Sequence, residues 1–122
     1  MKRIPFVPLA LVCILALFAV AACRPSLEFS PASLPDAQTG SAYTATITVE
    51  NTATPIGDAY VSAGSLPPGV ELEWSKDQDN TTIRIAGTPT ASGSYTFTIS
   101  VWCLGTNVSG QTGDQEYTLV VK

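Results

Sequence analysis

From residue 27 onward, the chain alternates apolar and polar residues between turn signals. In residues 43–50 the apolar side chains of Tyr43, Ala45, Ile47 and Val49 are separated by threonines. Because successive side chains of a strand point to opposite faces, this spacing predicts a strand with one buried face. No window in this region shows helical spacing over the roughly ten residues that a helix needs. The pattern predicts seven short strands, near residues 27–29, 43–50, 59–63, 70–74, 83–85, 95–101 and 117–121.

This number of short strands in roughly 100 residues is typical of an antiparallel sandwich of two sheets. We therefore predict an all-β fold for the domain over residues 27–122. Between the last two strands, residues 104–115 contain three glycines and are predicted to form a long loop.

The hairpin over residues 70–86 allows a prediction of strand register. Leu72 is placed opposite Ile83 on the buried side, which brings Glu71 opposite Arg84 on the exposed side. An exposed ion pair between neighbouring strands contributes about 0.2–1 kcal/mol. Such a pair would guide the pairing of the strands rather than hold the fold together.

The N-terminus carries a positive segment followed by an apolar one. Lys2 and Arg3 precede an unbroken run of 14 apolar or small residues, 9–22. A membrane-spanning helix needs about 20 apolar residues, whereas the core of a signal peptide needs about 7–15. We therefore predict that residues 1–22 are a cleaved signal peptide. An uncleaved signal anchor and an ordinary secretory peptide remain as alternatives.

The end of the apolar run, Val20-Ala21-Ala22-Cys23, resembles a bacterial lipobox. This resemblance implies cleavage before Cys23, a diacylglyceryl group on its thiol and an N-acyl chain such as palmitate on its amino group. More than one acyl chain holds a protein firmly on a membrane. The chain would then be a lipoprotein anchored in the cell envelope, with residues 23–26 as the lipidated tether. Arg24, in place of a retaining aspartate, implies the outer membrane if the cell has one, and otherwise the outer face of the plasma membrane.

Charge and composition exclude several classes of function. A chain that begins at Cys23 has four basic and ten acidic residues, a net charge of −6, and so lacks the basic surface that nucleic-acid binding requires. The sequence has no histidine, and Cys103 is the one thiol of the predicted domain. Because neither a Ser-His-Asp nor a Cys-His arrangement can be assembled, we do not expect an enzyme.

Three motifs between residues 66 and 99 point to a family. The segments LPPGV at 66–70, IAGTPT at 85–90 and GSYTFTI at 93–99, in this order and spacing, resemble the bacterial putative-immunoglobulin domains related to dystroglycan-type cadherin-like modules. The resemblance implies an immunoglobulin-like β-sandwich of about seven antiparallel strands. The antibody-type disulfide is absent, because Ile47 and Phe97 occupy inward positions where paired cysteines would be expected.

The residues of the three motifs are explained by their roles in the fold rather than by chemical reactivity. Proline stiffens a bend and donates no hydrogen bond to a ladder, and glycine can adopt positive φ. A tyrosine at the start of a central strand can pack its ring inward and bond the backbone through its hydroxyl, as in a tyrosine corner. The residues assigned such structural roles are Pro67, Pro68, Gly69, Gly87, Pro89, Gly93 and Tyr95.

Three residues are candidates for interaction. Trp102 follows the inward row of its strand with opposite parity and should point outward, either as an interaction or sugar-stacking surface or covered by the following loop. Tyr60 is a second interaction candidate. Cys103 continues the inward row and should be a small buried residue, with an intermolecular disulfide as the alternative.

A calcium site is a further hypothesis. Asp77, Asp79 and Asn80 superficially resemble the calcium ligands of cadherins. Calcium takes six to eight oxygen ligands, whereas Asp and Asn are also common in solvated turns. We therefore expect a turn and no metal or other cofactor beyond the lipid on Cys23.

Together these inferences favour a lipid-anchored, non-catalytic module of the cell envelope. Its partners would be the membrane, through the anchor, and an envelope protein or glycan, but not nucleic acid. The alternative function is a calcium-binding adhesion module of the cadherin-like type.

Overall fold

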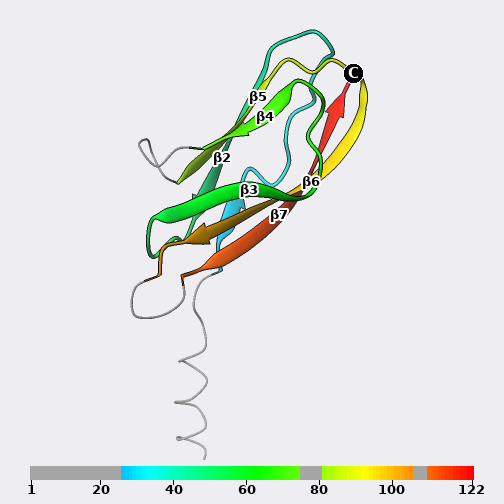
Figure 1. Ribbon diagram of the computed structural model, residues 1–122. Coiled ribbons are helices and arrows are strands. Elements are labelled where there is room, and N and C mark those ends of the chain that lie inside the picture. The colour runs from blue at the N-terminus through cyan, green and yellow to red at the C-terminus, as the bar shows by residue number, and fades with distance from the viewer. Residues whose placement is uncertain (1–25, 75–80, 106–109) are drawn as a thin grey trace, which may run out of the picture.

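The computed structural model describes residues 26–74, 81–105 and 110–122. These residues form seven strands and no helix, so no helix among them could cross a bilayer (Figure 1). The strands are β1 (Glu28–Ser30), β2 (Tyr43–Glu50), β3 (Ile56–Gly64), β4 (Val70–Glu73), β5 (Thr82–Gly87), β6 (Gly93–Cys103) and β7 (Thr112–Val121). The predicted all-β fold is confirmed.

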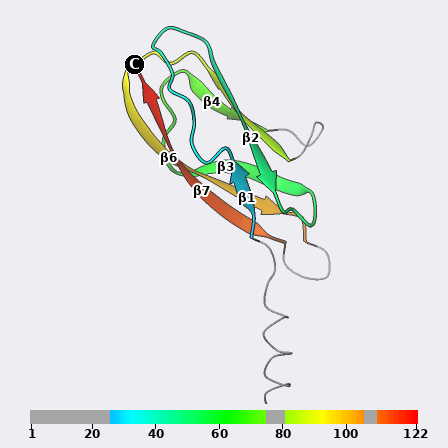
Figure 2. The ribbon, with the colours of Figure 1, turned by 180° about the vertical axis from the view of Figure 1, so that it is seen from behind.

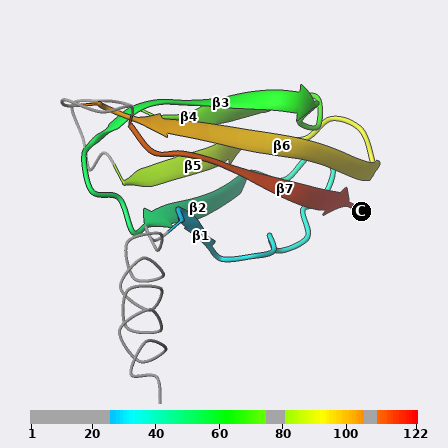
Figure 3. The same cartoon turned by 90° about the horizontal axis from the view of Figure 1, so that it is seen from below.

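The strands form two antiparallel sheets. One sheet has the order β1-β2-β5-β4, and the other has the order β3-β6-β7. In Figure 3 the strands β3, β6 and β7 lie side by side in the order of their sheet. The predicted immunoglobulin-like sandwich of about seven antiparallel strands is therefore confirmed in architecture.

The core lies between the inward faces of the two sheets. In β2 the alternation of buried and exposed residues follows the predicted pattern from Tyr43 to Glu50. On the other sheet, Phe97 and Tyr117 pack with ring centroids 6.2 Å apart. Because disulfides contribute nothing among the described residues, burial of these apolar rows supplies the cohesion.

The predicted long loop over residues 104–115 is wrong in its second half. Strand β7 begins at Thr112, and the N–H of Cys103 donates to the carbonyl of Gln111 at 2.8 Å. Gly113, which favoured a loop in the sequence, is a strand residue that lies against Leu27 and Phe29. A side chain at residue 113 would collide with Leu27, so the glycine serves close packing rather than a turn.

The predicted register of the β4–β5 hairpin is also wrong, by two residues. Arg84 lies opposite Glu73 rather than Glu71, and Leu72 is shifted in the same way to Ile85. The Nε of Arg84 donates to the carboxylate of Glu73 at 2.7 Å. Because a shift of two residues preserves the alternation of faces, the buried and exposed sides of the hairpin are as predicted.

The register is set at the other end of these strands, where the Pro-Pro-Gly corner meets β5. Val70 lies opposite Gly87, and the N–H of Thr88 donates to the carbonyl of Gly69 at 3.1 Å. The N–H of Thr90 donates to the carbonyl of Pro68 at 3.0 Å. Gly69 has φ of +87°, and a Cβ on Gly87 would overlap the carbonyl of Gly69. These contacts fix the pairing independently of the hairpin loop.

The segment between β1 and β2 leaves their common sheet, contacts β7 of the other sheet and returns. Ala37 forms a parallel bridge with Val121 of β7. The hydroxyl of Tyr43 donates to the carbonyl of Pro35 at 2.8 Å, and that of Tyr117 donates to the carbonyl of Pro31 at 2.9 Å. Two buried tyrosines thus hold a segment that has no alternating pattern of its own.

Different parts of the chain lie at the two ends of the sandwich. Figure 2 shows the start of β1 and the start of β7 at one end, with the C-terminus at the other. The β2–β3 connection, residues 51–55, lies at the same end as β1 because Asn51 Nδ2 donates to the carbonyl of Ser26 at 3.4 Å. We call this the N-terminal end of the domain.

Candidate functional site

Two aromatic side chains stand on the outer face of the three-stranded sheet. On β6 the buried Val101 and Cys103 flank Trp102, whose side chain therefore points outward. Tyr60 of β3 lies opposite Ser100 and is therefore diagonal to Trp102. Diagonal neighbours on adjacent strands are about 7–8 Å apart, within reach of aromatic side chains. Tyr60 exposes 46% and Trp102 41% of its surface, so both are accessible.

The indole of Trp102 rests on a glycine. Strand β3 has an irregularity between Ile56 and Asp58, which places Gly57 and Asp58 against the single residue Trp102. A Cβ on Gly57 would overlap the six-membered ring of Trp102. Gly57 is buried for this reason, and the side chain of Trp102 is held against the strand on one side while the other stays exposed.

A buried hydroxyl lies beside this aromatic pair. Ser100 is 7% exposed, and its Oγ lies 2.6 Å from the Oγ of Ser62 and 2.6 Å from the Oδ1 of Asp114. Because a serine has one hydroxyl proton, Ser100 donates to the Asp114 carboxylate and accepts from Ser62. The contact fixes one carboxylate oxygen of Asp114 and leaves the other oxygen available.

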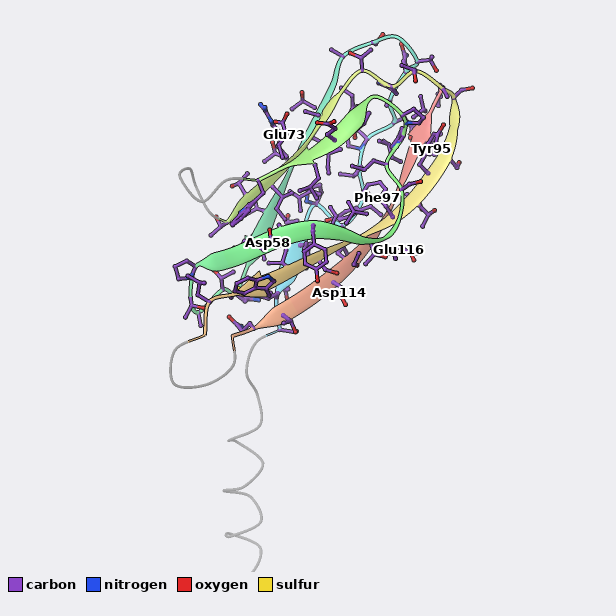
Figure 4. The ribbon with its side chains drawn as sticks, in the orientation of Figure 1. Asp58, Glu73, Tyr95, Phe97, Asp114 and Glu116 are labelled. Atoms are coloured by element: carbon purple, nitrogen blue, oxygen red, sulfur yellow. The ribbon has the colours of Figure 1, made fainter. Side chains whose placement is uncertain are left out.

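The same face carries carboxylates from its two outer strands. Figure 4 shows Asp58 on β3, and Asp114 and Glu116 on β7. Among the described residues the basic side chains are Arg84, which pairs with Glu73, and Lys122, which pairs with Asp36 at 3.0 Å. Within this part of the chain, the outer face of the β3-β6-β7 sheet is therefore aromatic and negatively charged.

At the N-terminal end the face continues into exposed apolar residues. Leu104 exposes 43% of its surface, although its backbone is fully bonded: its N–H donates to Pro55 at 2.9 Å and its carbonyl accepts from the Thr54 hydroxyl at 2.6 Å. Pro55 is also exposed. We call Pro55, Trp102 and Leu104 the apolar end patch.

The side chain of Gln111 ties the connections at this end together. Its Oε1 accepts from the N–H of Ala53 at 2.7 Å, and its Nε2 donates to the carbonyl of Asn51 at 3.1 Å. Since Asn51 in turn bonds Ser26, one run of hydrogen bonds links the start of the domain to the β6–β7 connection. Hydrogen bonds therefore join the connections at the N-terminal end to one another.

The residues expected to support the fold lie at the two corners beside β5 and β6. Pro67 and Pro89 are buried, whereas Pro68 is exposed. Gly93 has φ of +143° and lies against the ring of Tyr95. The hydroxyl of Tyr95 donates to the carbonyl of Ala91 at 3.1 Å, which closes the corner before β6.

The remaining candidates are either buried or outside the described residues. Cys103 is 2% exposed, and burial raises the pKa of its thiol. The candidate calcium ligands Asp77, Asp79 and Asn80, and the candidate lipidation site Cys23, lie outside the described residues. Within the described part, no group of three or more His, Cys, Asp or Glu side chains is arranged to hold a metal.

Sequence reasoning missed Gly57, Leu104 and the Ser100–Asp114 contact. The outward parity of Leu104, two residues after Trp102, was a usable signal for its exposure. Gly57 meets Trp102 through pairing of β3 with β6, which are far apart in the chain. Asp114 lies in residues 104–115, which the sequence favoured as a loop, so its pairing with Ser100 was not visible.

Comparison with known proteins shows the fold and the family. Similar solved structures include the SrpA adhesin from Streptococcus sanguinis, with 16% identity, a TM-score of 0.59, and coverage of 84% of this chain and 59% of that one. An endo-fucoidan hydrolase of glycoside hydrolase family 107 has 18% identity, a TM-score of 0.56, and coverage of 80% and 14%. At these identities the likeness concerns the fold alone, and the chain spans less than two thirds of either protein. No curated protein matches the chain. A family model described as a putative Ig domain matches residues 25–122, and the chain therefore belongs to the putative Ig domain family.

Proposed function

We propose that the chain is a lipid-anchored module of the bacterial cell envelope that binds a protein or glycan partner without catalysing a reaction. The observation that carries the proposal is the exposed Tyr60 on the outer face of β3, beside the Ser100–Asp114 contact. An immunoglobulin-like sandwich is a frequent scaffold for interaction. A non-catalytic role is consistent with membership of the putative Ig domain family.

The chemistry of this face fits a partner with apolar and hydrogen-bonding groups. Tyrosine offers a large contact area with few rotatable bonds, so its ordering on binding costs little entropy. Carboxylate oxygens of Asp58 and Asp114 accept hydrogen bonds from hydroxyl or ammonium groups. An aromatic ring flanked by hydrogen-bond acceptors suits a sugar ring or a protein side chain. The proposed partner is therefore a glycan or a protein.

Photo-crosslinking in intact cells tests the binding face. A photo-crosslinking phenylalanine derivative is introduced at Tyr60, and in a control protein at Thr46, which is exposed on the other sheet. We expect a cross-linked product from position 60 and none from position 46. Digestion of the product with a protease or a glycosidase then identifies the class of partner. Equal products from both positions, or none from position 60, would contradict the proposal.

The anchor is the second part of the proposal. The lipobox ends at Cys23 and β1 begins at Glu28, so the segment between the lipid and the sheet is short. Residues 24–26 span about 10 Å when extended, which keeps the domain close to the membrane, the outer membrane where the cell has one. Two or more acyl chains on Cys23 would hold it there.

Mass spectrometry of the mature N-terminus tests the anchor. We expect Cys23 as the first residue, carrying a diacylglyceryl group and an N-acyl chain. Globomycin, which inhibits the lipoprotein signal peptidase, should leave the signal peptide attached, and Cys23→Ser should prevent lipidation. A mature protein that begins at another residue without lipid would refute the anchor.

A further inference from the structure

We propose that the apolar end patch of Pro55, Trp102 and Leu104 rests on the lipid bilayer and orients the domain on its membrane. This inference rests on the proposed anchor at Cys23 and adds the surface of the domain that the lipid contacts. The occupant is the interfacial layer of a bilayer, where aromatic and aliphatic side chains meet headgroups.

The position of the patch is the first argument. Ser26, the first described residue, accepts a hydrogen bond from Asn51, and Asn51 is bonded by Gln111. The carbonyl of Gln111 accepts from the N–H of Cys103, which lies between Trp102 and Leu104. The domain therefore begins at the end that carries the patch. An anchor about 10 Å before Ser26 keeps this end at the lipid surface.

The rigidity of the patch is the second argument. Both backbone groups of Leu104 are bonded, to Pro55 and Thr54, so the fold fixes the backbone that carries its exposed side chain. Trp102 is paired on both sides, with Asp58 of β3 and Thr112 of β7, and its ring rests on Gly57. Side chains held in place lose little further entropy when they enter an interface.

The chemistry of the side chains is the third argument. Tryptophan is enriched at membrane–water interfaces because its ring is apolar and its N–H is polar. Leu104 lies two residues nearer the end than Trp102, about 7 Å along a strand. Interfacial elements bury their apolar side chains about 5–10 Å into the headgroup and acyl boundary. Tyr60, set further back on β3, would stay in water and remain free for a partner.

Charge determines which lipids favour the contact. Glu28 and Glu50 lie opposite each other near the N-terminal end. On the outer face Asp58 lies opposite Trp102, and Asp114 is its diagonal neighbour on β7. Anionic headgroups would repel these carboxylates, so attraction between charges does not drive the contact. We expect the patch to insert most deeply in zwitterionic bilayers, with salt weakening the effect of anionic lipid.

Depth-dependent fluorescence quenching tests the proposal. The full-length gene carrying Trp74→Phe is expressed, and the lipoprotein is purified from membranes and placed in phosphatidylcholine vesicles. Trp102 is then the remaining tryptophan, and among the described residues the Nε1 of Trp74 has no hydrogen-bond partner. We expect phosphatidylcholine brominated near the top of its acyl chains to quench Trp102. Its emission should be shifted to the blue relative to an unlipidated protein expressed without residues 1–22 and carrying Cys23→Ser.

A matched variant supplies the control. Trp102→Phe with Tyr60→Trp, in the Trp74→Phe background, moves the fluorophore to a position of similar exposure that lies further from the end. This tryptophan should show no quenching and no blue shift. Leu104→Ser should reduce quenching of Trp102, and a thermal melt of each variant checks that the sandwich is intact.

The outcomes separate the two proposals. Lipid on Cys23 together with quenching of Trp102 and not of position 60 supports the membrane contact. Lipid on Cys23 with Trp102 unquenched overturns the contact while the anchor stands. Equal quenching at both positions overturns the assignment of the lipid-facing end. Absence of lipid on Cys23 removes the anchor and the contact together.

Discussion

Trp102 lies with its indole against the backbone of Gly57, where an added Cβ would overlap the ring. The pair joins β6 to the irregular part of β3, where two residues oppose one. The packing of this pair determines the orientation of an exposed aromatic side chain. Its energetics can be measured apart from any partner.

Gly57→Ala is expected to destabilise the domain by about 1–3 kcal/mol, the usual cost of adding a methyl group to a closely packed site. The ring of Trp102 must move away from β3, so its fluorescence should also change. Urea unfolding measures the loss. In a Trp102→Ala background the same substitution should cost much less, because the obstructing ring is gone. An equal cost in both backgrounds would show that the glycine is needed for another reason.

The register of β4 and β5 predicts which glutamate couples to Arg84. Glu73 lies opposite Arg84 and bonds it, whereas Glu71 lies opposite Ala86. Both partners are about half exposed, so a double-mutant cycle between Glu73 and Arg84 should give a coupling of about 0.2–1 kcal/mol. The matched cycle between Glu71 and Arg84 should give none. A larger coupling to Glu71 would restore the register that the sequence favoured.

These cases show how far local pattern determines the fold. The alternation from Tyr43 to Glu50 predicted β2 correctly, because one face of that strand is buried and the other is in water. The segment containing Ala37 has no such alternation, since it pairs with β7 at one bridge and is otherwise held by hydrogen bonds from side chains and loops. The hairpin register failed because a shift of two residues leaves the buried face unchanged, and side-chain pattern cannot distinguish the two.

The candidate site also combines features that the sequence pattern predicted with features that it did not. Strand parity was enough to turn Trp102 outward and Cys103 inward. The rest of the surface was not predictable: Gly57 reaches Trp102 through pairing between distant strands, and Asp114 lies in a stretch that the glycines marked as a loop. The glycine at 113 was misread because a residue without a side chain serves a turn and a close contact equally well in sequence.

Cys103 should be inert in the folded protein. Its side chain is 2% exposed, and burial raises the pKa of the thiol, which lowers the fraction of reactive thiolate. In a protein expressed without residues 1–22 and carrying Cys23→Ser, Cys103 is the one remaining thiol. A thiol reagent should react with it only as fast as the domain unfolds, and readily in denaturant. Rapid reaction without denaturant, or a disulfide-linked dimer on a non-reducing gel, would favour the intermolecular disulfide instead.

Calcium at millimolar concentration should leave the melting temperature unchanged. Asp77, Asp79 and Asn80 are the proposed ligands, and three neighbouring side chains supply fewer than the six to eight oxygens that calcium takes. A ligand that binds only the folded state stabilises it by RT ln(1 + [L]/Kd) and so raises the melting temperature with increasing ligand concentration. A rise with calcium that is absent with magnesium, and lost in Asp77→Asn with Asp79→Asn, would support the adhesion hypothesis.

Alkaline pH should weaken the domain through Tyr117. Its phenol is 2% exposed, donates to Pro31 at 2.9 Å, and has its pKa raised by burial from 10.0 to about 12. Because the folded state holds the proton more tightly than the unfolded chain, stability is full below pH 10 and falls as the pH rises towards 12. A rise in pKa of this size corresponds to roughly 2–3 kcal/mol.

Tyr117→Phe separates this effect from other alkaline titrations. Loss of the hydrogen bond should cost the variant about 0.5–1.5 kcal/mol at neutral pH. Between pH 10 and 12 its free energy of unfolding should fall less steeply than that of the unsubstituted protein, because one titrating group is removed. The free energy of unfolding of the variant should still fall in this range, because burial and the nearby Asp36 also raise the pKa of Tyr43. Identical slopes for the two proteins in urea unfolding would show that the Tyr117 phenol does not determine alkaline stability.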